Sequence, residues 1–318
     1  MSESESSIVM SVLQGPLCGT LATMLLYGVV CMQTFHYWQA YEHDGKILKS
    51  VVAFIWILET AHTALSIHFV EYYLIIHFGE LLQLLFAVWS MGATYFVGFI
   101  IGYAVNLCFI WRILLLSQKR WIAVLFVIVA TVRCGFGLAN CVLSWTYPLW
   151  TEFRIRVFST MVVGQVLSAV VDGAIALTLC LYIRKLHLVA LRTDSVLNRL
   201  LLYSINTGAA TSLFAILAVI VFLVLPTNPA FIAFVQVQSK LYAISLLASL
   251  NTRKSTFEMT KQSVPAADGV ALSLFKTTPQ HPSYMHPIKV QKSAVMDIYG
   301  DDVDTYTGNN STTQESEC

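Results

Sequence analysis

Long apolar stretches, separated by short polar or proline-containing connections, dominate the chain between residues 15 and 250. A helix needs about 20 mostly apolar residues to cross the hydrocarbon core of a bilayer. The pattern therefore predicts an all-α fold, an integral membrane bundle of seven transmembrane helices. The predicted helices cover about 15–37, 48–69, 92–116, 121–145, 157–183, 199–225 and 229–250.

The connections between these stretches support the division. Lys119 and Arg120 separate the third stretch from the fourth, and Pro226 and Pro229 separate the sixth from the seventh, because proline ends a helix. The segment 71–91 fits less well, since its apolar run LLQLLFAVW is too short to span alone. We expect an interfacial or re-entrant piece there, with an eighth crossing by 72–90 as the alternative.

Composition places the chain in a membrane rather than in water. It is 57% hydrophobic and 12% charged, with mean hydropathy +0.68, whereas a soluble domain carries about 25% charged residues. Membrane lipids are therefore the expected partners. The net charge of +1 gives no sign of nucleic-acid binding. The seven cysteines have no zinc-site or CxxC spacing, so neither a metal nor another cofactor is predicted.

Lysine and arginine are unevenly distributed between the two sets of connections. They are frequent in the first, third and fifth connections and after the last apolar stretch, whereas the opposite set holds Arg154 and Arg156. Since basic connections stay in the cytoplasm, the N-terminus is predicted outside and the C-terminal tail inside. The predicted organisation is a short extracytoplasmic N-terminus (1–14), a transmembrane domain (15–254) and a disordered cytoplasmic tail (255–318). A cytoplasmic partner would bind the basic connection 184–199 or the tail.

Several stretches carry a family resemblance. They are RTDSVLNRLLLYSINTG (192–208), SKLYAISLLASLNTR (239–253), GPLCGTLATMLLYG (15–28) and Gln33. Together they resemble fungal, chiefly basidiomycete, multi-pass membrane proteins that share a C-terminal domain of unknown function. That domain ends in an LNxR signature, here Leu250 to Arg253, and the similarity covers about 165–255, with a weaker match over the other predicted spans. The resemblance implies a seven-span membrane protein and assigns no catalytic or binding residue.

Four charged residues lie in the middle of apolar stretches: Glu59, Arg133, Asp172 and Lys240. A charge at the centre of a bilayer costs about 2.5–3.5 kcal/mol on the mildest scale. At 1.5 Å per residue, all four lie about 15–18 Å from the cytoplasmic ends of their helices, near the midplane. They are therefore expected either to pair inside the bundle or to line a polar pocket, and the sequence does not decide between these.

Other polar residues at similar depth extend this candidate site. They are His62, Tyr103, Asn106 and Asn206. His62 is one helical turn from Glu59, close enough for contact. Gly98 and Gly102 form a GxxxG pattern that is expected to pack helices within one chain.

The leading functional hypothesis is a receptor- or sensor-like membrane protein with a polar midplane pocket and an unidentified small-molecule ligand. A small-solute or proton transporter is the alternative, and a lipid-interacting scaffold with structural ion pairs is a third. Retinal attachment at Lys240 is disfavoured, because microbial rhodopsins carry Asp where this chain has Gln236. We expect no enzyme activity, since the chain has no HExxH, GxSxG or Walker motif.

Overall fold

The computed structural model describes residues 3–189, 195–226 and 228–263, all within one compact unit, Met1–Thr278. Side chains are described for residues 9–185 except 11 and 81, and for 208–226 and 228–252. The connection 190–194 and residues 264–318, which include most of the predicted tail, lie outside the described residues.

Helices account for all the regular structure among the described residues, which confirms the all-α prediction. The long helices are α1 (Glu3–Ala40), α2 (Lys46–Glu71), α3 (Trp89–Ser117), α4 (Arg120–Thr146), α5 (Trp150–Val189), α6 (Ser195–Val224) and α7 (Phe231–Ser263). Two short pieces lie between α2 and α3, a π-helix η1 (Tyr72–Ile76) and a 3-10 helix η2 (Leu81–Leu85).

Six of these helices, α1 to α5 and α7, are long and apolar enough to cross a membrane. The part of α6 whose side chains are described, Gly208–Val224, is apolar but shorter. Crossing by α6 therefore remains a prediction, as does the orientation of the chain. α7 also continues past residue 254, where the tail was predicted to begin, because Ser255–Ser263 holds good helix formers and no proline or glycine.

The segment between α2 and α3 forms no long helix. η1 and η2 have five residues each, and a turn with Gly79 at φ +82° separates them. Pieces of this length cannot cross a hydrocarbon core, so 72–90 does not form an eighth crossing. Ile75, Phe78 and Leu82 are 71%, 70% and 73% exposed, which agrees with an interfacial segment.

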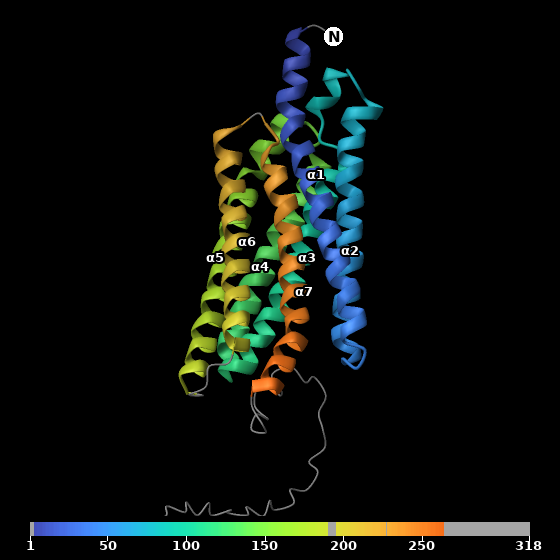
Figure 1. Cartoon of the computed structure of the whole chain (residues 1–318). Coiled ribbons are helices and arrows are strands. Elements are labelled where there is room, and N and C mark those ends of the chain that lie inside the picture. The colour runs from blue at the N-terminus through green and yellow to red at the C-terminus, as the bar shows by residue number, and fades with distance from the viewer. Residues whose placement is uncertain (1–2, 190–194, 227, 264–318) are drawn as a thin grey trace, which may run out of the picture. The chain divides into compact units, whose positions relative to one another are not determined.

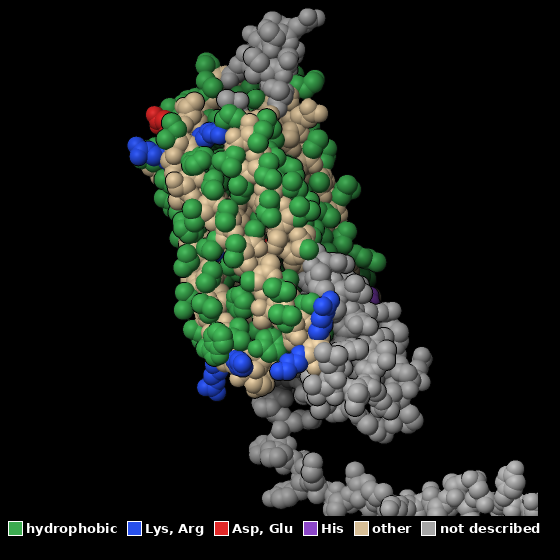
Figure 2. Space-filling model, turned by 90° about the vertical axis from the view of Figure 1, so that its left-hand side faces the viewer, with side chains coloured by type: hydrophobic (Ala, Val, Ile, Leu, Met, Phe, Trp, Pro, Cys, Tyr) green, Lys and Arg blue, Asp and Glu red, His purple; other side chains and the backbone are tan. Residues whose placement is uncertain are grey.

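α7 is the central helix of the bundle and packs against α1, α2, α3 and α6 (Figure 1). Its membrane-length stretch is 72% buried, compared with 22–44% for the other five candidate spans. On the face seen in Figure 2, hydrophobic side chains cover most of the surface, and lysine and arginine lie toward the two ends. This distribution suits a bundle with lipid around its middle and water at its ends.

Glycines allow some of these helices to approach closely. A Cβ added to Gly19 on α1 would lie 2.5 Å from the Ala233 Cα of α7. One added to Gly102 would lie 2.6 Å from an Arg133 guanidinium nitrogen, and one on Gly98 would lie 3.5 Å from His62. Both glycines of the GxxxG pattern therefore face other helices of the same chain, as expected from the sequence.

Candidate functional site

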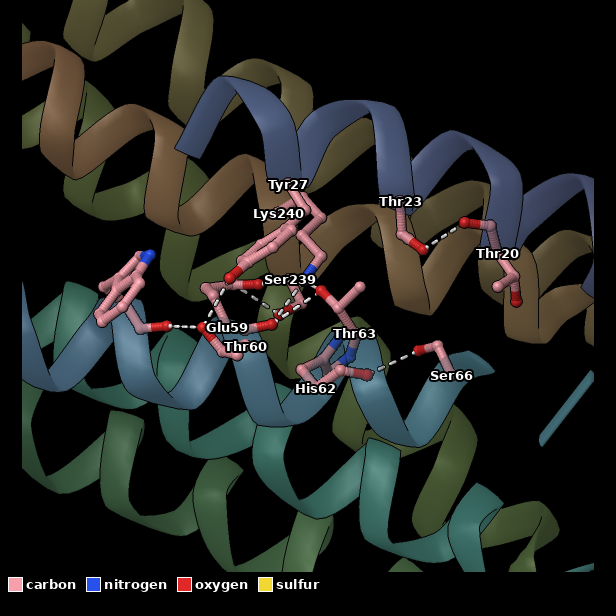
Figure 3. Close-up of polar contacts among 11 residues, drawn as sticks. Thr20, Thr23, Tyr27, Glu59, Thr60, His62, Thr63, Ser66, Ser239 and Lys240 are labelled. Atoms are coloured by element: carbon pink, nitrogen blue, oxygen red, sulfur yellow. Dashed lines mark hydrogen bonds and ion pairs between the residues drawn. The ribbon is translucent and has the colours of Figure 1, made fainter. Parts of the chain in front are cut away.

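Lys240 of α7 and Glu59 of α2 form an ion pair inside the bundle, and both side chains are fully buried (Figure 3). The Lys240 ammonium also donates to the Thr63 hydroxyl at 2.7 Å and to the Glu59 backbone carbonyl at 3.1 Å. Its three hydrogens therefore each have an acceptor. Ser239 donates to the second carboxylate oxygen of Glu59 at 3.1 Å, so both charges are paired and hydrogen-bonded.

Helix α1 covers this ion pair from a third side. The Lys240 ammonium lies 5.3 Å from the centre of the Tyr27 ring, in cation–π range. The Tyr27 hydroxyl is 2.7 Å from the Thr60 hydroxyl of α2 (Figure 3). α1, α2 and α7 are thus joined at one level of the bundle.

A second polar cluster has the Tyr242 hydroxyl at its centre. This hydroxyl donates to the Asp172 carboxylate and accepts from Arg133 at 3.0 Å and from Gln238 at 3.2 Å. Asn106 donates to the other Asp172 oxygen at 3.2 Å. Helices α3, α4, α5 and α7 each contribute to this cluster.

Arg133 and Asp172 are connected through Tyr242 rather than by a direct ion pair. Lys240 pairs directly with Glu59, and half-buried His77 pairs with exposed Glu80, whereas Arg133 and Asp172 meet at the Tyr242 hydroxyl. The Arg133 Nε donates to the Ser168 hydroxyl at 2.6 Å. The Arg133 Cζ atom lies 5.5 Å from the centre of the Phe99 ring and 5.0 Å from that of the Tyr242 ring. One tyrosine hydroxyl therefore links two buried, opposite charges.

The space beside this cluster is small. A cavity of about 20 Å³ touches Asn106, Asp172 and Tyr242. A single water needs roughly 10–15 Å³ by the same measure, so the cavity has room for about one water molecule. The described side chains around Asp172 contact one another and leave little space between them, and the midplane pocket for an organic ligand stays a prediction.

The sequence-predicted residues fall into three groups. Glu59 and Lys240 meet in the first cluster, and Arg133, Asp172 and Asn106 meet in the second. Two others take no part in either cluster. Tyr103 lies 3.1 Å from Thr131 at an exposed position, and buried His62 has no partner for its Nδ1 atom. The side chain of Asn206 lies outside the described residues.

The uncharged side chains that contact the buried charges, or that complete their clusters, were not predicted from the sequence. They are Tyr27, Thr63, Ser168, Gln238, Ser239 and Tyr242. Two spacings gave a usable signal: Thr63 is four residues after Glu59, and Ser168 is four before Asp172. The run QVQSKLY (236–242) in α7 is also unusually polar for the most buried helix of the bundle.

The part of the chain that the structure describes contains no candidate metal centre. No group of three or more His, Cys, Asp or Glu side chains there is placed to hold a metal ion.

Comparison with known proteins gives one match. Residues 168–255 match the model of a family of unknown function (DUF6534), which covers less than half of the chain. No curated protein and no solved structure matches. The match confirms the resemblance to a domain of unknown function, whereas the fungal source and the LNxR signature remain predictions. Together with the apolar helices, it is compatible with a multi-pass membrane protein.

Proposed function

We propose that this chain is a seven-span, receptor- or sensor-like membrane protein in which α6 is the seventh crossing and α7 is the responding helix. The two polar clusters hold α7 in one position against the rest of the bundle. A stimulus that weakens one cluster would let α7 move relative to α2, α4 and α5.

The observation that carries this proposal is the position of two residues on α7. Lys240 is bound to Glu59 of α2, whereas Tyr242, two residues further on, is bound to Arg133 of α4 and Asp172 of α5. Both clusters are buried, and a buried charge that loses its partner is strongly unfavourable. Such contacts favour discrete positions of a helix over gradual displacement, which is the property that a two-state switch requires.

The same geometry favours a receptor over a transporter of solutes. A solute path needs polar space across the middle of the bundle, whereas the described cavity beside Asp172 holds about one water. A purely structural scaffold is the remaining alternative, and it differs from a receptor in one measurable respect. In a scaffold α7 has one position, and in a receptor it has two.

Spin-label distances in proteoliposomes test this difference. In a cysteine-free background, one label replaces the exposed Ile47 of α2, and the other replaces Thr252, the last residue of α7 whose side chain is described. The wild-type protein is expected to give one narrow distance distribution. Glu59→Gln, which weakens the hold on α7, is expected to add a second distance.

Two further measurements complete the test. The double variant Glu59→Gln with Lys240→Met, which leaves no unpaired charge in this cluster, separates loss of folding from movement of α7. An unchanged distance in a folded Glu59→Gln protein would mean that α7 has one position and would refute the proposal in favour of a scaffold. Steady flux of protons or small solutes through wild-type proteoliposomes would refute it in favour of the transporter.

A further inference from the structure

The connection from α2 to α3, with η1 and η2, lies at one end of the bundle (Figure 1). A large cavity is lined by residues of this connection and of the neighbouring helices. Its volume is about 430 Å³, within the roughly 300–1,000 Å³ of sites that hold drug-sized ligands. It is bounded by the five long helices α1, α2, α3, α5 and α7 and by the short pieces η1 and η2. Its lining includes Val12 of α1, Phe69 of α2, Ile232 of α7, and Leu82, Leu84 and Leu85 of η2.

Among the residues whose side chains are described, the lining of this cavity is mostly apolar and includes no charged side chain. The Tyr73 hydroxyl is already occupied, because it donates to the Phe86 carbonyl at 2.6 Å and accepts from the Val88 amide at 3.1 Å. Water in such a space has few hydrogen-bonding partners, and an empty space forfeits van der Waals contacts. The lining therefore selects an uncharged, mainly apolar occupant, and the buried Trp150 indole N–H, which has no hydrogen-bond partner among the described residues, can donate to one acceptor atom on it.

The η2 segment provides a route into the cavity. Leu82 and Leu85 both line it, yet they are 73% and 50% exposed, so η2 is a thin wall between the cavity and the surroundings. Trp89 and Trp145 are exposed at the same end, and the Trp145 indole donates to the Trp89 carbonyl at 3.1 Å. Exposed tryptophans mark the membrane interface, which places the wall within reach of molecules dissolved in lipid.

We propose that this cavity binds one uncharged, lipid-soluble molecule with a long aliphatic chain, which enters from the membrane past η2. The inference rests on the proposed function and names its ligand class. An occupant would touch Phe69 of α2 and Ile232 of α7, the two helices that the Glu59–Lys240 ion pair joins. Occupancy of the cavity and the state of the ion pair are coupled through these helices.

Photolabelling of the full chain in nanodiscs tests the binding step. The probe is an octadecanol analogue that carries a diazirine and an alkyne, and the competitor is excess octadecanol. We expect labelled peptides from α1, η2 and the start of α7, with labelling suppressed by the competitor. Val12→Trp fills part of the cavity and is expected to weaken competition about tenfold, the lower end of the effect of pocket-shape changes.

Matched variants keep the outcome interpretable. Met10→Trp is the control on α1, because Met10 is 69% exposed and does not line the cavity. If Val12→Trp fails to fold, Leu84→Trp replaces it, with the 70% exposed Phe78→Trp as the control on the same connection. Wild-type-like competition in a folded cavity-filling variant would overturn the inference. So would labelling confined to outward-facing positions such as Leu25 and Ile57.

The two proposals fail separately. Specific labelling without any second α7 distance in Glu59→Gln would keep the cavity site and reject the sensor. Two α7 distances without competed labelling would keep the sensor and reject this ligand class.

Discussion

At the scale of single residues, Lys240 and Glu59 depend on each other. A Lys240→Met variant leaves the Glu59 carboxylate buried without its cation, and we expect a loss of about 3–5 kcal/mol in the free energy of unfolding. Adding Glu59→Gln removes the second charge and should restore most of that loss. Reversible unfolding in mixed micelles, arranged as a double-mutant cycle, measures the coupling.

One result of the double-mutant cycle would contradict this expectation. Additive losses from the two substitutions would mean that the pair contributes no coupling, and the ion pair would not hold α7 to α2. Thr60→Val on the same helix is a suitable control, because it removes the exposed contact with Tyr27 and leaves both charges paired.

Tyr242 offers a second residue-scale prediction. Tyr242→Phe removes the one hydroxyl that joins Asp172, Arg133 and Gln238, so we expect a loss of about 2–3 kcal/mol in unfolding free energy. Tyr103→Phe removes one exposed contact with Thr131 and should cost about 0.5 kcal/mol. Equal effects of the two substitutions in the same unfolding assay would contradict the central role of the Tyr242 hydroxyl.

The positions of the buried charges could be predicted from sequence, but their partners could not. Glu59, Arg133, Asp172 and Lys240 stood out because a charge within an apolar stretch is costly. Depth along a helix follows from residue number, whereas the side on which a residue meets its neighbour depends on lateral packing. That packing brought Tyr242 between Arg133 and Asp172 and left Tyr103, at similar depth, only partly buried beside Thr131.

At the scale of elements, contacts between helices depend on glycine at specific crossings. A Cβ on Gly137 of α4 would lie 2.3 Å from the Phe99 ring of α3, whereas one on Gly135 would have nothing within 4 Å. We expect Gly137→Ala to lower the unfolding free energy by about 1–3 kcal/mol, because overpacking forces the helices apart. Gly135→Ala should be neutral or stabilising by up to about 1 kcal/mol, since alanine favours helix.

The two α4 variants are compared by thermal unfolding of purified protein. A loss of equal size in both would point to a general intolerance of α4 to substitution rather than to the α3–α4 contact.

The helices themselves were predictable from their apolar length, and proline and basic residues marked several of their ends. The short pieces η1 and η2 were not, because their form depends on contacts such as Tyr73 with Phe86.

At the scale of the whole molecule, the number of crossings sets the side on which each end of the chain lies. Seven crossings place the N-terminus and the tail on opposite sides, and six place them on the same side. Asn309 and Asn310 are natural N-glycosylation acceptors in the tail, and a cytoplasmic tail leaves them unmodified. Glu5→Asn completes an acceptor with Ser7 on the predicted outer side, where we expect modification.

Glycan at either position lowers the mobility of the protein on a denaturing gel, and treatment with an endoglycosidase reverses this shift. Glycan on the tail would overturn the predicted orientation. Absence of glycan from both the natural tail acceptors and the Glu5→Asn acceptor would favour six crossings with both ends in the cytoplasm, and α6 would then not cross.

The central position of α7 also determines the order in which the protein can be completed during synthesis. Glu59 precedes its partner Lys240 by 181 residues, and Arg133 and Asp172 likewise precede Tyr242. At about 5–20 residues per second, a ribosome adds Lys240 about 10–40 s after Glu59. Until then, three charges on helices already made lack their partners from α7. α7, the last helix among the described residues, therefore completes both polar clusters. A chain that ends before residue 231 leaves these three charges without their α7 partners, a feature that membrane quality control can recognise.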